Sequence, residues 1–157
     1  MKCPRCRTEL GSETIAGLAL HSCAQCGGLL LDHASFDRAA ELPDLQSELI
    51  ELANDLRGAA RIEIDLKKVV YLSCPACGGS MARKNFGRVS GAMVDVCNTH
   101  GIWFDQGELS RCLEFVRDGG GDRTARFEQA EAEHEREQRK VIAEIERKTP
   151  KFRGGWF

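Results

Sequence analysis

The sequence has no long apolar segment and few aromatic residues. Phenylalanine, tryptophan and tyrosine make up 6% of the 157 residues, and no stretch is long and uncharged enough to cross a bilayer. The chain opens with Met1-Lys2-Cys3-Pro4, which lacks the apolar core of a secretory signal segment. We therefore expect a cytoplasmic protein without a membrane partner, in which thiols stay reduced and disulfides are rare.

The sequence also lacks an excess of basic charge. Its 22 lysines and arginines are outnumbered by 24 aspartates and glutamates, for a formal net charge of -2 with the cysteines neutral. Thiolates bound to metal would make the chain more acidic still. This balance argues against a generic nucleic-acid binder, because such proteins draw most of their affinity from cations that contact phosphate.

What the sequence has in quantity is cysteine. Six of its eight cysteines form three Cys-x-x-Cys pairs, and a fourth pair reads Cys97-Asn98-Thr99-His100. Two residues between ligands allow a tight turn to direct both at one ion, and two such turns complete a tetrahedron. The spacing predicts two metal sites, with the ligand sets Cys3, Cys6, Cys23, Cys26 and Cys74, Cys77, Cys97, His100.

Zinc is the metal that these ligands favour. The histidine of the second site points to zinc, whereas the four thiolates of the first site also suit a single iron ion. Disulfides are disfavoured by the expected reducing compartment, and a thioredoxin-like redox motif by the regular recurrence of the pairs. Four ligands leave no open position for catalysis, and no nucleophile and base pair is visible. We expect two structural Zn²⁺ ions and no enzymatic activity.

Residues 1–42 and 72–118 repeat one plan. In each, two short strands flank a turn and bring two metal-binding turns, or knuckles, together; a buried strand ending in aspartate and a helix follow. The predicted fold is a small metal-bound α+β protein of two tandem zinc ribbons, each a β-hairpin plus zinc knuckles followed by a helix. Neither unit is large enough to bury a stabilising core without metal. Because the sites share no ligand, we expect one ribbon to persist when the other loses its ion.

Local signals within the ribbons predict backbone and packing details. Glycine follows three of the four knuckles and permits positive φ, whereas Arg7 occupies this position after Cys6 at a cost on the order of 1 kcal/mol. Asp105 and Glu108 predict a capping box for the second ribbon's helix, and a weaker cap is expected at Asp32. Cys112 reads as a small buried hydrophobe, with a role as spare ligand in place of His100 as the alternative.

Other side chains in the ribbons read as structural. Trp103 is expected in the core rather than in base stacking. His21 and His33 are expected at the surface rather than as ligands, because their site already has four thiolates.

The motifs resemble the bacterial family of TFIIB-type zinc-finger proteins, in two copies. The likeness lies in Cys-Pro-x-Cys at the start and in Gly-Ile-Trp-Phe-Asp-x-Gly-Glu-Leu at 101–109. The first copy keeps Cys-x-x-Cys-Gly-Gly, but has Leu30, Ala34 and Ser35 where tryptophan, glycine and glutamate are usual; the second is one glycine shorter and has His100. The resemblance implies a structural metal-binding role and a link, by name, to transcription factors, without a reaction or a defined target.

Two further regions flank the second ribbon. In the connector, residues 43–71, leucines at helical spacing predict a helix over 44–57, and alternation predicts a strand over 61–66. In the region 119–157, three glycines predict a flexible break, followed by a charge-dense helix over 122–148. This segment is either a lone solvated helix or partly disordered, or else a coiled-coil or partner-binding helix.

Two function classes survive. A protein-protein adaptor would use the charged helix and the aromatic tail, with candidate contacts at Phe152, Arg153, Trp156 and Phe157. A nucleic-acid-binding, transcription-associated factor would use the basic hairpin of the second ribbon, with candidate contacts at Arg83, Lys84, Phe86 and Arg88. Another protein is the favoured partner, and the oligomeric state stays open.

Overall fold

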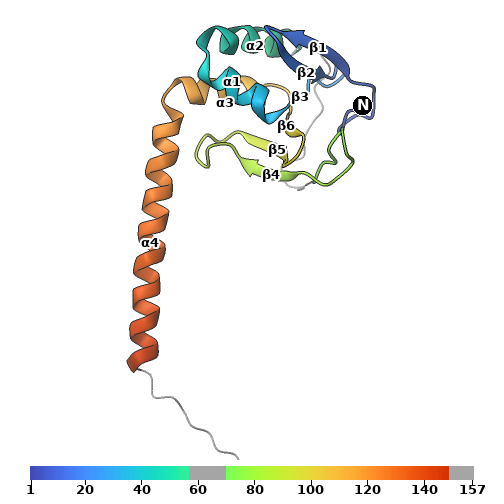
Figure 1. The fold of residues 1–157 in the computed structure, drawn as a ribbon. Helices are drawn as coiled ribbons and strands as arrows, with labels where there is room; N and C mark the ends of the chain where they lie inside the picture. Colours follow the sequence, from blue (N-terminus) through green and yellow to red (C-terminus); the bar gives the residue numbers. More distant parts are fainter. Residues whose placement is uncertain (57–69, 149–157) are drawn as a thin grey trace, which may run out of the picture.

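The computed structural model describes residues 1–56 and 70–148, which form an α+β structure with one antiparallel sheet (Figure 1). The first half contributes β1 (Gly11–Ile15), β2 (Leu18–Ser22), β3 (Leu29–Leu31), α1 (His33–Glu41) and α2 (Pro43–Asp55). The second half contributes β4 (Ala82–Asn85), β5 (Met93–Cys97), β6 (Gly101–Phe104), α3 (Glu108–Arg117) and α4 (Gly120–Lys148). Both predicted hairpins and the short buried strand after each are confirmed.

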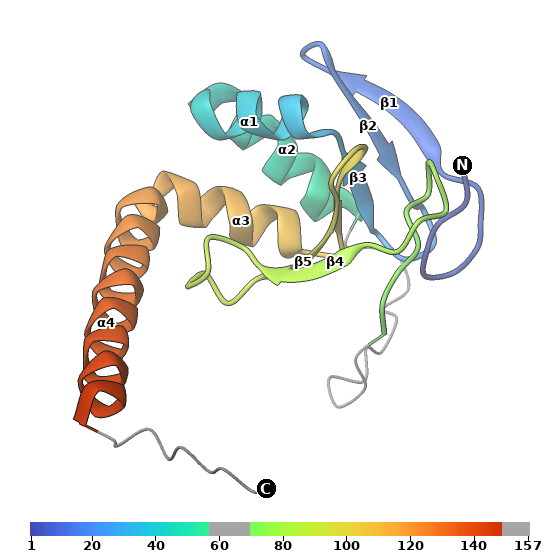
Figure 2. The same ribbon diagram turned by 60° about the horizontal axis from the view of Figure 1, so that its bottom comes forward.

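The two halves are joined in a single six-stranded sheet of order β1-β2-β3-β6-β5-β4. Its two hairpins, β1–β2 and β4–β5, therefore lie at opposite ends of the sheet (Figure 2). The strands β3 and β6 pair antiparallel in the middle, with Leu30 opposite Trp103. The repeat in the sequence thus appears as two units placed edge to edge. Two ribbons in tandem were predicted, and the pairing of β3 with β6 was not.

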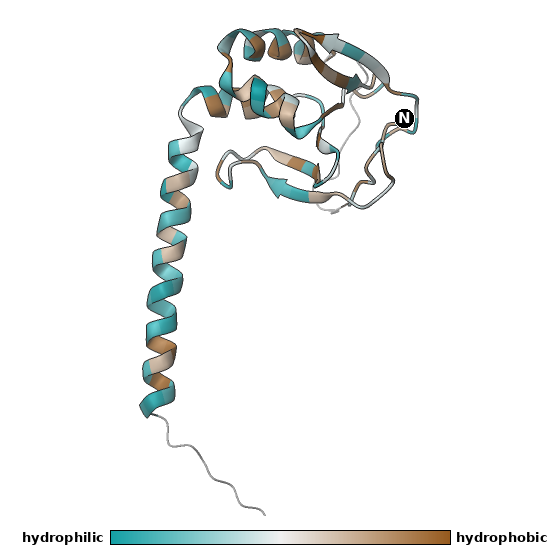
Figure 3. Ribbon diagram, viewed as in Figure 1, coloured by the Kyte–Doolittle hydropathy of each residue, from teal (hydrophilic) through white to brown (hydrophobic). Residues whose placement is uncertain are grey.

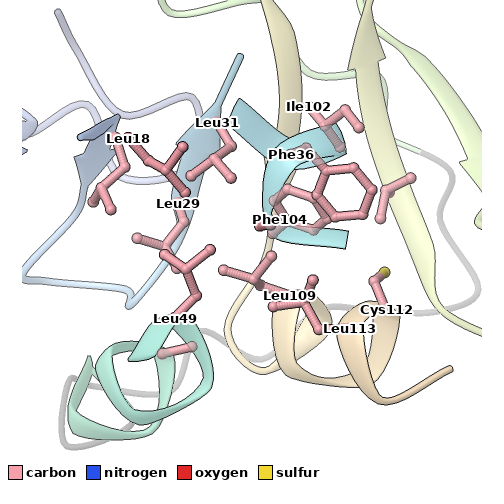
Figure 4. Packing of buried hydrophobic residues seen from close by; sticks show 14 of the residues in the cluster. Leu18, Leu29, Leu31, Phe36, Leu49, Ile102, Phe104, Leu109, Cys112 and Leu113 are labelled. Atoms are coloured by element: carbon pink, nitrogen blue, oxygen red, sulfur yellow. The ribbon is translucent and has the colours of Figure 1, made fainter. Parts of the chain in front are cut away.

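One face of the sheet carries a hydrophobic core to which both halves contribute. The helices α1, α2 and α3 supply its other side, and Leu31, Leu49, Phe104 and Leu113 have no exposed surface (Figure 4). The ring of Phe36, from α1, stacks on Phe104 of β6 with centroids 5.5 Å apart. Burial of this kind contributes about 1.5–3 kcal/mol per large apolar side chain, so the halves stabilise each other.

The connector helix is confirmed and packs on its own chain. It begins at Pro43, and Leu45 and Leu49 point into the core, where α2 contacts α1 and α3. Proline suits this first helical position because its missing N–H would have no intrahelical partner. The strand predicted over 61–66 lies outside the described residues.

The predicted helix cap is present at the start of α1 and differs from the prediction at the start of α3. Asp32, where a weak cap was expected, is the N-cap of α1 and accepts from the Ser35 N–H at 2.8 Å. Helix α3 has Gly107 as its N-cap, with φ of 79°, so the predicted N-cap at Asp105 is wrong. Half of the capping box survives, because the Asp105 N–H donates to the Glu108 carboxylate at 2.9 Å. The Asp105 carboxylate instead accepts hydrogen bonds from the side chains of Arg5 and Trp103.

The predicted flexible break at 119–121 is instead a close-packed corner between α3 and α4. Gly119 turns the chain with φ of 76°, and Gly120 begins α4 directly against Phe115, where an added Cβ would lie 2.3 Å from the ring. The close approach, rather than flexibility, explains the glycine there. The predicted charged helix is confirmed, including the ion pairs Glu135–Arg139 and Glu144–Lys148.

Candidate metal centres

Each ligand group is assembled by a hairpin that separates its two knuckles. Three knuckles close with the same backbone hydrogen bond, in which the residue after the second cysteine donates to the carbonyl of the first, at 2.8–3.0 Å. The donating residues are Arg7, Gly27 and Gly78, with φ of 66°, 68° and 73°. The predicted positive φ is confirmed, and Arg7 adopts it despite having a side chain.

The first group brings together Cys3, Cys6, Cys23 and Cys26. Its four sulfurs lie within 4.8 Å of one another, with Cys3 and Cys26 Sγ 3.5 Å apart and Cys6 and Cys23 Sγ 3.3 Å apart. Zinc bound tetrahedrally by sulfurs at about 2.3 Å would hold them about 3.8 Å apart. The group therefore fits one four-coordinate ion with modest expansion.

The second group brings together Cys74, Cys77, Cys97 and His100. Cys77 and Cys97 Sγ are 4.0 Å apart, and His100 presents Nδ1 to Cys97 Sγ at 3.5 Å. These separations also fit a single four-coordinate ion. Cys112 is not part of the group: it lies in the hydrophobic core, where burial raises the pKa of its thiol to about 12, so the prediction of a buried hydrophobe is confirmed.

The surroundings favour the thiolate, the form of cysteine that binds metal, at some of the candidate ligands and disfavour it at others. Burial raises the pKa of Cys6 and Cys74, and the hydrogen bond with Cys3 raises that of Cys26. The hydrogen bond with Cys26 lowers the pKa of Cys3 to about 5. At Cys97 burial raises the pKa, but hydrogen bonds from the His100 ring and from knuckle backbone groups outweigh it and bring the value to about 6. The Thr8 hydroxyl lies 3.2 Å from Cys6 Sγ and 3.4 Å from Cys23 Sγ, where it can donate to either sulfur.

The two groups differ in exposure. In the first, Cys3 and Cys23 have no exposed surface, and Cys26 is buried. In the second, Cys77 is exposed to solvent and His100 is half-buried. Solvent and competing ligands therefore have a more open path to the second group.

Sequence reasoning missed a buried ion cluster beside the first group. Arg5, between Cys3 and Cys6, donates from Nε and Nη2 to both oxygens of the Asp105 carboxylate, the first at 2.9 Å. The carboxylate of Asp95, fully buried, lies 3.3 Å from Arg83 and 3.9 Å from Arg5. The available signal was an arginine inside a knuckle and an aspartate at the end of a buried strand.

His33 also has an unforeseen contact. Its Nε2 lies 2.9 Å from the carbonyl oxygen of Cys97, a ligand of the second group, and its side chain is half-buried. Neither His33 nor His21 belongs to a ligand group among the described residues, and both are half-buried, whereas both were expected at the surface. Trp103 is fully buried and donates from Nε1 to Asp105 Oδ1 at 3.0 Å, so its prediction as a core residue is confirmed.

The four candidate nucleic-acid contacts lie on the β4–β5 hairpin, and three of them have partners within the chain. Arg83 pairs with Asp95, and Arg88 reaches Glu128 at 3.3 Å and Glu131 at 2.7 Å on α4. Phe86 makes edge contacts with two other rings, and Lys84 is exposed. The candidate partner contacts Phe152, Arg153, Trp156 and Phe157 lie outside the described residues.

The small α+β fold carries two four-residue groups that could each hold a metal ion, which defines a candidate metal-binding protein. Residues 2–42 match the family model described as transcription factor zinc-finger, of the TFIIB zinc-ribbon type, which supports one zinc ribbon there. Comparison with curated proteins and with solved structures gives no match. Within residues 1–56 and 70–148, no helix has the length and hydropathy needed to span a membrane.

Proposed function

We propose that this chain is a non-catalytic double zinc-ribbon protein that acts as a protein-protein adaptor. Each ligand group would hold one structural Zn²⁺, which supplies the cross-link between knuckles that a small unit otherwise lacks. The family match over the first ribbon supports this role for the first site, and the matching knuckle geometry supports it for the second. Four ligands at each site leave no position for a substrate.

The observation that carries the adaptor proposal is the exposed helix α4. Its 29 residues span roughly 43 Å at 1.5 Å per residue, and it extends away from the ribbons (Figure 1). The ribbon is coloured as hydrophobic at several positions near its far end (Figure 3), where Val141 and Ile142 are 49% and 55% exposed. Exposed apolar residues on a polar helix are typical of a surface that binds another helix or a groove.

The base of α4 is fixed to the second ribbon. The Thr124 hydroxyl donates to the Gly87 carbonyl at 2.8 Å, and Arg88 from the same hairpin pairs with two glutamates of α4. The ring of Phe115 adds a contact with Arg123 at 4.6 Å. The helix therefore presents its far end in a defined direction relative to the metal centres.

Binding of nucleic acid is the alternative. The description of the matching family as a transcription factor zinc-finger supports it, as does the exposed cation of Lys84. Against it, Arg83 and Arg88 are already paired with carboxylates, which would have to be displaced by phosphate. This mode requires affinity for random DNA or RNA that falls steeply with salt.

A pair of matched substitutions on α4 tests the adaptor role. Val141→Glu places a charge among the exposed apolar residues, whereas Ala143→Glu places the same charge 200° further round the helix. We expect Val141→Glu to abolish capture of protein partners from a cell extract, with Ala143→Glu close to wild type. Equal capture by both variants, together with salt-sensitive binding to random nucleic acid, would favour the alternative.

A further inference from the structure

The two metal centres are linked by the buried ion cluster around Arg5. Arg5 lies in the first knuckle, between two ligands of the first centre, and its backbone N–H is 3.4 Å from Cys3 Sγ. Its guanidinium reaches the second ribbon, where it donates two hydrogen bonds to the Asp105 carboxylate and lies 3.9 Å from the Asp95 carboxylate. The three side chains are 11%, 7% and 0% exposed in that order, so solvent screens the cluster little.

Both carboxylates stand next to the second centre along the chain. Asp95 is in β5, two residues before Cys97, and Asp105 directly follows β6, which itself begins after His100. Arg5 thus contacts one carboxylate in β5 and one directly after β6, the two strands that flank one knuckle of the second centre. No ligand is shared between the centres, and the connection runs through second-ribbon carboxylates.

Trp103 reinforces the same connection. Its Nε1 donates to Asp105, and its ring lies against Gly28, where an added Cβ would be 2.2 Å from a ring carbon. Gly28 follows the second knuckle of the first centre and accepts, through its carbonyl, from the Cys23 N–H at 2.9 Å. Both knuckles of the first centre therefore meet the Asp105 end of β6.

The charges in the cluster make Arg5 more than a packing residue. The side chain of Asp95 is fully buried, and its Oδ1 has no hydrogen-bond partner among the described residues. Arg83 is the other cation in contact with this carboxylate. Removing one partner from a buried ion pair is strongly unfavourable, because the remaining charge is left uncompensated.

We propose that Arg5 couples the two centres, so that a metal ion in the first raises the affinity of the second. An ion bound by Cys3 and Cys6 fixes the loop that presents Arg5, and Arg5 in turn neutralises the carboxylates beside the second knuckle. By linkage the effect is reciprocal, and couplings of this type reach about 5- to 150-fold. The inference rests on the proposed metal binding and adds that the centres fill cooperatively.

Titration of the metal-free full-length chain with Co²⁺, in competition with a chelator, tests the coupling. Four-thiolate and three-thiolate-imidazole cobalt sites differ in their absorption, so each centre is followed separately. We expect the second centre's affinity to fall about tenfold or more when the first is blocked by Cys3→Ser and Cys6→Ser. Arg5→Met alone should cause the same fall, and combining it with the blocked centre should add nothing further.

Arg83→Met is the matched control, because Arg83 contacts the same Asp95 but lies in the second ribbon and does not bridge the two. In this variant, blocking the first centre should still weaken the second. Arg5→Lys keeps the positive charge but loses the paired hydrogen bonds to Asp105. We expect it to retain part of the coupling. Partial coupling in this variant would show that the charge, and not a loss of folding, causes the effect of Arg5→Met. An Arg5→Met protein whose second centre binds Co²⁺ as tightly as wild type overturns the inference. Failure of either ligand group to bind metal in the wild-type chain overturns the proposed function instead.

Discussion

The two ribbons share a plan and differ in how well their ligands are covered. In the first, three of the four sulfurs are buried, and the hydroxyl of Thr8 and the backbone N–H of Arg5 approach the ligands. In the second, Cys77 is exposed and one ligand is an imidazole. The knuckle spacing sets ligand geometry in both, whereas the neighbouring chain sets accessibility. The two candidate sites are therefore expected to differ in how easily a bound metal ion would be lost.

Replacing one ligand in each centre should give the largest effects and the clearest difference. Cys26→Ser places a hydroxyl at a residue that is only 6% exposed, while Cys77→Ser leaves a position that water can reach. Zinc binding by small structural sites is worth about 10–16 kcal/mol, more than most domains have in total stability. We expect Cys26→Ser to lose cooperative unfolding and Cys77→Ser to keep a melting transition with a weakened second ion, measured by elemental analysis and circular dichroism. Equal losses in both variants would remove the distinction between the centres.

The join between the ribbons can be probed with two glycines that both have positive φ and follow a knuckle. Gly101→Ala would bring a Cβ within 2.0 Å of the Leu31 carbonyl oxygen across the β3–β6 pair, whereas around Gly78 nothing lies within 4 Å. Both substitutions carry backbone strain of about 1 kcal/mol, and only Gly101→Ala adds overpacking of about 1–3 kcal/mol or more. Denaturant unfolding of zinc-loaded protein should show this order, and similar values would mean that the join contributes little.

The sequence predicted what is encoded locally. Spacing placed eight ligands in two groups, alternation and turn residues placed both hairpins, and leucine spacing placed α2. The pairing of Leu30 with Trp103 joins strands more than seventy residues apart, and no local pattern specifies such a partner. The prediction of an N-cap at Asp105 was wrong for a related reason, because its carboxylate accepts hydrogen bonds from Arg5, one hundred residues away in the chain.

The caps of α1 and α3 differ in a way that pH should reveal. The α1 cap is the Asp32 carboxylate, where burial raises the pKa but hydrogen bonds from Ser35 outweigh it and keep the pKa below its usual value. The α3 start uses Glu108, whose pKa is raised to about 7 by burial and by repulsion from Asp105, against the hydrogen bond from the Asp105 N–H and the attraction of Arg83 and Arg111. A carboxyl with a raised folded pKa stabilises the fold at low pH, and this contribution is lost as pH rises through about 7.

Glu108→Gln keeps an acceptor for the Asp105 N–H and cannot ionise. Relative to wild type, we expect the variant to gain stability between about pH 5 and 7, up to roughly 3 kcal/mol. Unfolding free energies of both proteins, measured across that range with excess zinc, check the sign. A constant difference between the two would show that Glu108 does not titrate in this window.

The smallest expected effect lies at the one knuckle that lacks a following glycine. Arg7 adopts φ of 66°, its side chain is exposed, and its N–H makes the same hydrogen bond as Gly27 and Gly78. Arg7→Gly therefore removes strain of about 1 kcal/mol without losing a buried contact, although the added freedom of the unfolded chain offsets part of the gain. We expect the zinc-loaded variant to melt slightly higher than wild type. Arg7→Ala, which keeps a Cβ, should show no gain, so an equal rise in both variants would trace the effect to the lost charge and not to the backbone.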